Sequence, residues 1–322
     1  MATPPKTKPQ AVSREPVTLE DLAPLERSDA FPLSDEEQRA LTVTTLGHIG
    51  PESRLPAFPA VAMQVVELAN RSGASANELV RLINQDPTLT AQLLRVANSV
   101  YSSRGIEITG ARDAVTRLGF KEVAALAATA ATKALFQEEL RAAGPAVLQE
   151  QSRLWIIALT SGLGASWLAM ETRGDSQKAF LGGMLHDIGK TLALRAYAEL
   201  RAAGKLEAPE PERALPFLLE ALHLELGTRV ASEWKLPAHV ARVCAEHHEP
   251  KATAREDREL HLVRVVAAIA EMHHDPHWPP QRMTEVEQSA AELGFDKYRL
   301  RATSTQLKEI ARKAQSLAKA AA

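Results

Sequence analysis

The sequence contains little cysteine and few aromatic residues. Cys244 is its single cysteine, which excludes an internal disulfide framework and any zinc site built from several cysteines. Phe, Trp and Tyr make up only 4% of the 322 residues. The cores of β-sheets draw heavily on aromatic and β-branched residues, whereas alanine, which recurs in runs such as Ala124 to Ala131, has the highest helix propensity. The composition therefore predicts an all-α protein.

The chain also lacks an excess of either charge. It has 38 Lys and Arg against 40 Asp and Glu, a net charge of -2. Proteins that bind nucleic-acid phosphates normally carry a basic excess, so a nucleic-acid partner is not expected. The stretch from Asp296 to Ala322 is basic, with seven Lys and Arg against two acidic residues. We interpret this stretch as the solvated face of a terminal helix, and binding to nucleic acid or an acidic partner is the weaker alternative.

Long hydrophobic segments are absent. The charge-free segment 154–170 is shorter than the about 20 residues that a membrane-spanning helix usually needs, and it contains Thr160, Ser161 and Ser166. We expect a buried core helix there and no membrane partner. The N-terminus lacks the apolar stretch of a signal peptide, so a cytoplasmic location is expected.

Proline and capping patterns divide the chain. Residues 1–32 contain six prolines and no sustained hydrophobic period, which predicts a flexible Pro-rich tail. Ser34 with Glu37, and Ser75 with Glu78, have the spacing of helix-capping boxes. Asp86-Pro87 has the pattern of an N-cap followed by proline in the first helical turn.

Gly144-Pro145 marks the expected internal boundary, because proline disfavours the helical conformation of the residue before it. We therefore expect an N-terminal helical lobe over 33–144, a second helical lobe over 145–255 and a C-terminal helical extension over 256–322.

Eight of the ten histidines lie between His223 and His277, and His186 directly precedes Asp187. Imidazoles and carboxylates are ligands that suit Zn, Fe and Mn, so the clustering suggests a metal centre. Surface or core roles are the better explanation for five of them: His239, His261, His273, His274 and His277. For His186-Asp187 and His247-His248 the two explanations are evenly balanced. An ionisable pair within the apolar segment 181–190 needs a partner, a hydrogen-bond network or a metal.

Several short motifs follow one another between residues 50 and 250. They are Leu55-Pro-Ala-Phe-Pro59, Asp86-Pro-x-Leu89 with Leu93-Leu-Arg-Val-Ala-Asn-Ser99, Leu118-Gly119, Leu185-His-Asp-Ile-Gly189, Trp234-Lys-Leu-Pro237 and His247-His248. In this order they resemble the HDOD domain, the HD-related output domain of bacterial signalling proteins. The resemblance implies an all-α fold related to HD-type phosphohydrolases, in which an N-terminal helical lobe packs on an HD-like helical lobe.

Active HD enzymes hold one or more metals and activate water for attack on a phosphate ester. By this resemblance, the residual metal ligands of the present chain would be His186, Asp187, His223, His247, His248 and Glu271. The early histidine of those enzymes is expected two positions after Trp155, where this chain has Ile157, which cannot ligate a metal. The late aspartate is expected near 270–271, where the chain has Glu271.

Three further sequence patterns bear on which activities and ligands are expected. Relatives that cleave cyclic di-GMP carry a Gly-Tyr-Pro motif after the paired histidines, and this chain has none, which disfavours that activity. Gly189-Lys190-Thr191 resembles the end of a phosphate-binding loop, but Met184 stands where the earlier glycine is required. Gly162 and Gly164 begin a dinucleotide-binding pattern whose third position is Trp167.

We therefore expect a non-catalytic bacterial signal-transduction module that binds a regulatory protein partner or a small regulator such as a nucleotide second messenger. No catalytic residue and no cofactor are expected. The alternative is a metal-dependent phosphohydrolase for phosphomonoesters, nucleotides or cyclic nucleotides, with Fe, Mn or Zn at the residual site. In an intermediate case, the site binds a metal structurally and supports no reaction.

Overall fold

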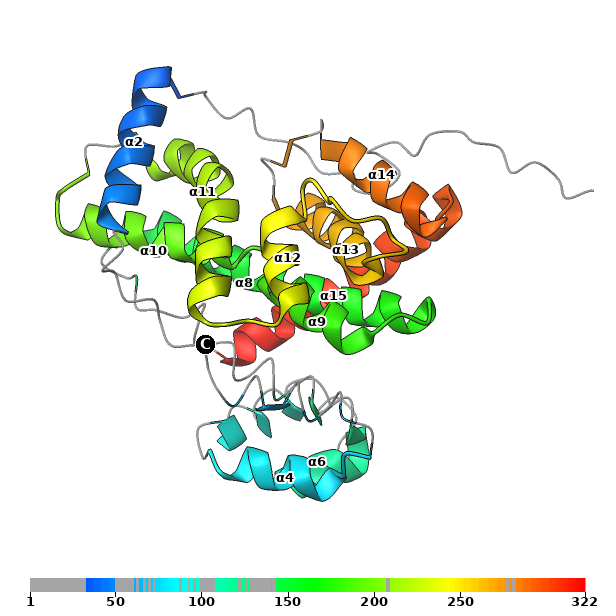
Figure 1. Ribbon diagram of the computed structural model, residues 1–322. Coiled ribbons are helices and arrows are strands. Elements are labelled where there is room, and N and C mark those ends of the chain that lie inside the picture. Colours follow the sequence, from blue (N-terminus) through cyan, green and yellow to red (C-terminus); the bar gives the residue numbers. More distant parts are fainter. Residues whose placement is uncertain are drawn as a thin grey trace, which may run out of the picture.

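The computed structural model describes residues 33–49, 73–86, 108–120, 143–206, 209–275, 278–279 and 282–321, with shorter stretches and isolated positions between 61 and 140. Every regular element within these residues is a helix, and none of them forms a strand. The predicted all-α fold class is therefore confirmed, and Figure 1 shows a larger helical body above a smaller one. The expected tail over 1–32 lies outside the described residues.

The smaller body contains α4 (Ala76–Asn84) and α6 (Ala111–Leu118). Ser75 caps α4 as its spacing predicts: its hydroxyl accepts a hydrogen bond from the Glu78 amide, and the Glu78 carboxylate accepts one from the Ser75 amide. α6 ends at Gly119, whose φ of 88° favours glycine because it has no Cβ. The Leu89 amide donates to Asp86, in agreement with an N-cap there.

The larger body is built around α8 (Pro145–Glu171), which begins directly after Gly144. It packs along α9 (Ser176–Leu185) at very close range. A Cβ placed on Gly183 would lie 2.5 Å from the Ser161 carbonyl oxygen, so glycine is required for this approach. Gly162 faces Met184, and Gly164 faces Leu307. The glycines that imitate a dinucleotide motif therefore serve helix packing.

Helices α10 (Ile188–Ala202), α11 (Pro211–Glu233) and α12 (Ala238–Glu246) follow α9. α10 packs mainly on α11, and α12 joins α11 to α9. The first helix, α2 (Asp35–His48), has the predicted capping box between Ser34 and Glu37. α2 packs on α10 and α11, so this part of the region 33–144 contacts the HD-like lobe.

The C-terminal extension completes the larger body. α13 (Arg258–His274) is buried along most of its length and packs on α8 and α9, while α14 (Met283–Leu293) packs on α13. α15 (Lys297–Ala321) lies against α8 and places Leu300, Leu307 and Ile310 in the same apolar cluster. The extension thus supplies much of this core.

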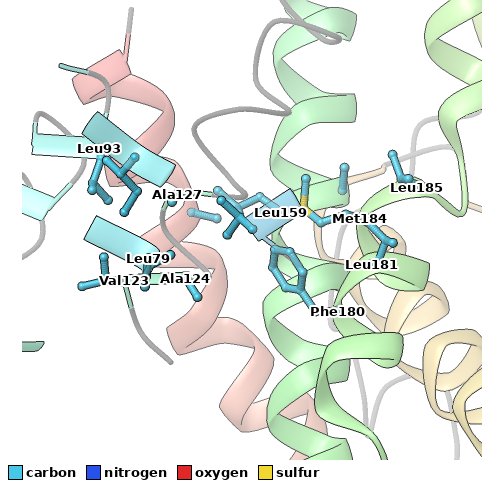
Figure 2. Packing of buried hydrophobic residues seen from close by; sticks show 14 of the residues in the cluster. Leu79, Leu93, Val123, Ala124, Ala127, Leu159, Phe180, Leu181, Met184 and Leu185 are labelled. Carbon is cyan, nitrogen blue, oxygen red and sulfur yellow. The ribbon is translucent and has the colours of Figure 1, made fainter. Parts of the chain in front are cut away.

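One apolar cluster joins the two bodies. Leu79 and Leu93 of the smaller body belong to the same cluster as Leu159 and Phe180 of the larger one (Figure 2). Ala314, near the end of α15, is fully buried in this cluster. The two bodies are therefore held together by the burial of apolar surface, which contributes roughly 25 cal/mol of stabilising free energy per Å².

Among the described residues, α8 is the helix that is long and apolar enough to cross a membrane. Of its most apolar window, 67% is buried inside the protein. Leu159, Ala165 and Leu168 are fully buried against other helices, which is the packing expected of a core helix.

Candidate functional site

The six residues predicted as residual ligands come from four separate parts of the larger body. His186 and Asp187 form the turn between α9 and α10, and His223 lies on α11. His247 and His248 follow α12, and Glu271 lies on α13. The structure brings them into two neighbouring groups. We call His223, His247 and His248 the imidazole group, and His186, Asp187 and Glu271 the carboxylate group; in each, potential ligand atoms lie within 4.8 Å of one another.

Asp187 lies at the junction of the two groups. Its Oδ1 is 3.4 Å from His247 Nε2 and 3.8 Å from His223 Nε2, while its Oδ2 is 3.4 Å from His186 Nε2. The side chain of Asp187 is only 7% exposed. Asp187 is thus a buried carboxylate with three imidazoles around it, and the pair has the neighbouring polar groups that a buried His-Asp motif needs.

Main-chain carbonyls orient three of the imidazoles. The Nδ1 atoms of His186, His223 and His247 lie 2.8 to 2.9 Å from the carbonyl oxygens of Gly183, Glu220 and Val243. We assign Nδ1–H as the donor, since a carbonyl only accepts. The Nε2 lone pairs of His223 and His247 then face the cluster. Burial disfavours protonation of His186, but the Asp187 carboxylate outweighs it and raises the pKa of His186, so its Nε2 faces Asp187 Oδ2 as a donor. Metal-binding histidines are oriented in the same manner.

His248 completes the imidazole group by a different route. Its Nε2 lies 2.7 Å from His223 Nε2, and its Nδ1 lies 2.8 Å from an Arg282 nitrogen. Because the Nδ1–H of His223 is already committed to a carbonyl, we assign the proton between the rings to His248. Arg282 then donates to the His248 Nδ1.

Close helix packing fixes the position of the His-Asp turn. A Cβ on Gly189 would lie 2.0 Å from the His223 carbonyl oxygen and 2.6 Å from the Gly227 amide nitrogen. Only glycine allows α10 and α11 to approach so closely. Gly189 thereby places Asp187 beside His223.

Lys190 is the central cation of the carboxylate group. Its Nζ lies 2.6 Å from Asp187 Oδ2 and 2.6 Å from Glu271 Oε1. Burial disfavours ionisation of Asp187, but Lys190 and His186 outweigh it and hold the pKa of Asp187 well below its usual value. The pKa of Glu271 falls to about 2, because Lys190 and Arg282 outweigh the effect of burial. Both carboxylates are therefore ionised and paired near neutral pH.

A second basic residue, Arg282 at the start of α14, covers the other side of Glu271. It lies 3.2 Å from Glu271 Oε2, 3.0 Å from Glu285 and 3.4 Å from Glu220. Glu220 and Arg282 also line a cavity of about 340 Å³ with Pro216, Phe217 and Asp275.

The three histidines of the imidazole group favour the neutral form. Burial lowers the pKa of His247 to about 4, although Asp187 favours its protonated form. Burial and the neighbouring His247 lower the pKa of His248 as well. Burial also lowers the pKa of His223. Neutral imidazoles are the form that binds metals.

The remaining histidines are placed differently. His261 is bonded to Ser289 and to the Ala252 carbonyl, and His273 is bonded to Ser304. These contacts agree with the structural roles expected for them. His277 lies outside the described residues. Ile157, at the position of the expected early ligand, is buried on α8.

By donor chemistry the imidazole group fits one divalent metal ion. The Nε2 atom of His247 is buried and hydrogen-bonded to no other described group, and His223 and His248 lie beside it. His248 would bind the ion through Nε2 in its other tautomer, in which Nδ1–H faces Glu285 Oε2 at 2.9 Å. The carboxylate group does not fit an ion in the same way, because Lys190 is already bound to the oxygens that a metal would need.

Sequence reasoning missed Lys190, Arg282, Glu220 and Glu285. One signal was available for Lys190, which lies three residues after Asp187 and so on the same face of α10. Arg282 follows a proline-rich stretch of the sequence and carries no comparable local signal.

Fold and site together define an all-α protein with a buried histidine–carboxylate cluster. A family model described as the HDOD domain matches residues 55–250. The chain therefore belongs to the HDOD domain family, as the motif order indicated.

A relative in Treponema pallidum (strain Nichols), an uncharacterized protein, is 25% identical over 215 residues. The match covers 64% of this chain and only 40% of that protein.

Solved structures share the fold at low sequence identity. An HDOD domain protein with unknown function from Geobacter sulfurreducens has a TM-score of 0.60 and 20% identity, covering 87% of this chain and 98% of that one. A Shewanella amazonensis SB2B protein, provisionally named a metal-dependent phosphohydrolase, has a TM-score of 0.55 and 22% identity, with coverages of 84% and 99%. A Marinobacter aquaeolei VT8 protein, provisionally named for signal transduction, has a TM-score of 0.58 and 18% identity, with coverages of 88% and 66%.

Proposed function

We propose that this protein is a non-catalytic regulatory module of bacterial signal transduction, which acts by binding a protein partner or a small regulator. One observation carries the non-catalytic part. Lys190 lies 2.6 Å from one oxygen of each carboxylate, so Asp187 Oδ2 and Glu271 Oε1 are not available as they would be in an HD-type hydrolase. Ile157 in place of the early histidine supports the same conclusion.

The regulatory part rests on membership of the HDOD family and on the Marinobacter protein of similar fold whose name refers to signal transduction. The cavity beside Glu220 and Arg282 offers a small regulator, such as a nucleotide second messenger, access to charged groups that touch the cluster. We place the protein in the cytoplasm, with neither membrane nor nucleic acid as its partner.

Hydrolysis assays test the non-catalytic part. The purified full chain is incubated with phosphomonoesters, nucleotides and cyclic nucleotides in the presence of Mn²⁺ or Fe²⁺, beside an Asp187→Asn variant. We expect both proteins to release phosphate at the same background rate. Turnover by the wild type that Asp187→Asn abolishes would overturn the proposal.

The second candidate is a metal-dependent phosphohydrolase. The orientation of the His223 and His247 rings by carbonyls favours it, because such rings present a lone pair to a metal. His223, His247 and His248, with Asp187, would hold an ion that supplies Lewis-acid polarisation of a phosphoryl oxygen. The solved structure named for this activity supports the candidate through its fold alone.

The partner can be tested by proximity labelling in the native cell, with the full chain compared with a Glu220→Gln variant. Glu220 is 42% exposed at the rim of the cavity, so the substitution changes the surface charge with little effect on the core. We expect a defined set of regulatory proteins whose labelling depends on Glu220. Identical labelling by the two proteins would place the partner surface elsewhere on the molecule.

A further inference from the structure

The carboxylate group contains two buried negative charges. Asp187 is 7% exposed and Glu271 is 3% exposed. Burial of an unpaired carboxylate costs several kcal/mol, so each needs a cation close by. In HD-type enzymes metals serve this purpose, whereas this chain supplies its own basic side chains.

Lys190 satisfies both carboxylates at once. Its side chain is 8% exposed, and its Nζ is equally close, at 2.6 Å, to Asp187 Oδ2 and Glu271 Oε1. An ammonium has three N–H donors, so two can serve these oxygens, while Glu220 lies further away at 3.7 Å. Lys190 and Glu271 are 81 residues apart in sequence, and their contact joins α10 to α13.

Arg282 completes the charge balance. It lies 3.2 Å from Glu271 Oε2, the oxygen that Lys190 leaves open. Lys190 and Arg282 therefore face Asp187 and Glu271, and Arg282 also pairs with Glu285 and Glu220 at the edge of the group. A divalent ion added beside Lys190 would be repelled by the ammonium and would have to compete for the same oxygens.

We propose that Lys190 is a built-in cation of the carboxylate group, which replaces a metal ion there and makes this half of the cluster independent of metal. Metal binding is then confined to the imidazole group. Removing the ammonium exposes a latent metal site formed by His186, Asp187 and Glu271. Because this inference concerns the number of ions rather than turnover, it goes beyond the proposed function.

The test compares the metal content of the full chain with that of Lys190→Met, a side chain of similar length without charge. Each protein is dialysed against Mn²⁺, freed of excess and measured for metal per chain, and its Tm is recorded with and without Mn²⁺. Wild type should hold at most one ion. Lys190→Met should hold one more than wild type, with a larger rise in Tm on addition of Mn²⁺.

Two matched variants make the result specific. Lys178→Met removes a lysine that is 49% exposed and lies 3.8 Å from its partner Asp175, and it should behave as wild type. Adding Glu271→Gln to Lys190→Met should abolish the extra ion.

Two ions per wild-type chain would overturn the inference, as would a folded Lys190→Met protein with unchanged metal content. Where Lys190→Met does not fold, a second ion in the wild type still overturns the inference. Hydrolysis by a wild-type protein with a single ion would overturn the proposed function and leave this inference intact.

Discussion

Gly189 and His223 touch through their backbones: a Cβ on Gly189 would lie 2.0 Å from the His223 carbonyl oxygen. The contact joins α10 to α11 next to Asp187 and His223 of the cluster. Since neither backbone can move alone without disturbing its helix, the glycine determines where Asp187 lies relative to His223.

Gly189→Ala should therefore destabilise the protein by about 3 kcal/mol or more, at the upper end for overpacked cores. Gly227→Ala is the matched control on the facing helix, because its Cβ would meet Cys244 at an ordinary 3.6 Å. We expect this control to cost less than about 1 kcal/mol, since alanine is the better helix former. Urea denaturation of the two variants measures the difference, and equal stabilities would contradict the packing argument.

Removal of one buried charge should unbalance the ion pairs of Lys190. Glu271→Gln leaves Lys190 and Arg282 with one carboxylate fewer, and we expect a loss of about 3 kcal/mol in the free energy of unfolding. Glu220→Gln, at 42% exposure and 3.7 Å from Lys190, should change it by less than about 1 kcal/mol. Chemical denaturation at neutral pH checks both values. Similar losses in the two variants would show that burial does not control the strength of these pairs.

His247 should remain neutral in the folded protein well below the usual pKa of histidine. Burial lowers its pKa from 6.5 to about 4, so its contribution to stability is full above pH 6.5 and is lost as the pH falls toward 4. In that window the unfolded chain binds the proton that the folded chain excludes. NMR of the ring nitrogens measures the titration directly. A midpoint near 6.5 would contradict the buried environment of this ring.

The C-terminal helix should be essential to the core. Leu307 is fully buried against Gly164 and the neighbouring α13, so Leu307→Ala should cost about 2–5 kcal/mol. Lys308→Ala, at the next and exposed position, should stay within about 0.5 kcal/mol. Thermal or urea unfolding compares them. A small effect of Leu307→Ala would mean that α15 is dispensable for the fold.

Local patterns predicted the parts of this structure that depend on neighbours in sequence. The capping boxes at Ser34 and Ser75 form as expected, since each involves residues three apart. The boundary at Gly144-Pro145 was predicted for a similar reason, because proline disfavours the helical conformation of the residue before it, and α8 begins there.

The cluster was predictable in part. The His-Asp pair and the later histidines follow from the motif resemblance, and the structure brings them within hydrogen-bonding or ion-pair distance. The charges that neutralise the cluster were not predicted. Lys190 was considered only as part of a phosphate-loop pattern, although its distance of three residues from Asp187 placed both on one helix face.

The sequence by itself determined the helical fold class, the helix caps and the identity of the imidazoles, because these depend on propensity, short spacings and motif order. Only the tertiary structure decided that Lys190 bridges Asp187 to Glu271 and that Arg282 covers Glu271. The physical reason is that a charge pair depends on distance and burial, and residues 81 positions apart acquire both only when α10 and α13 pack together.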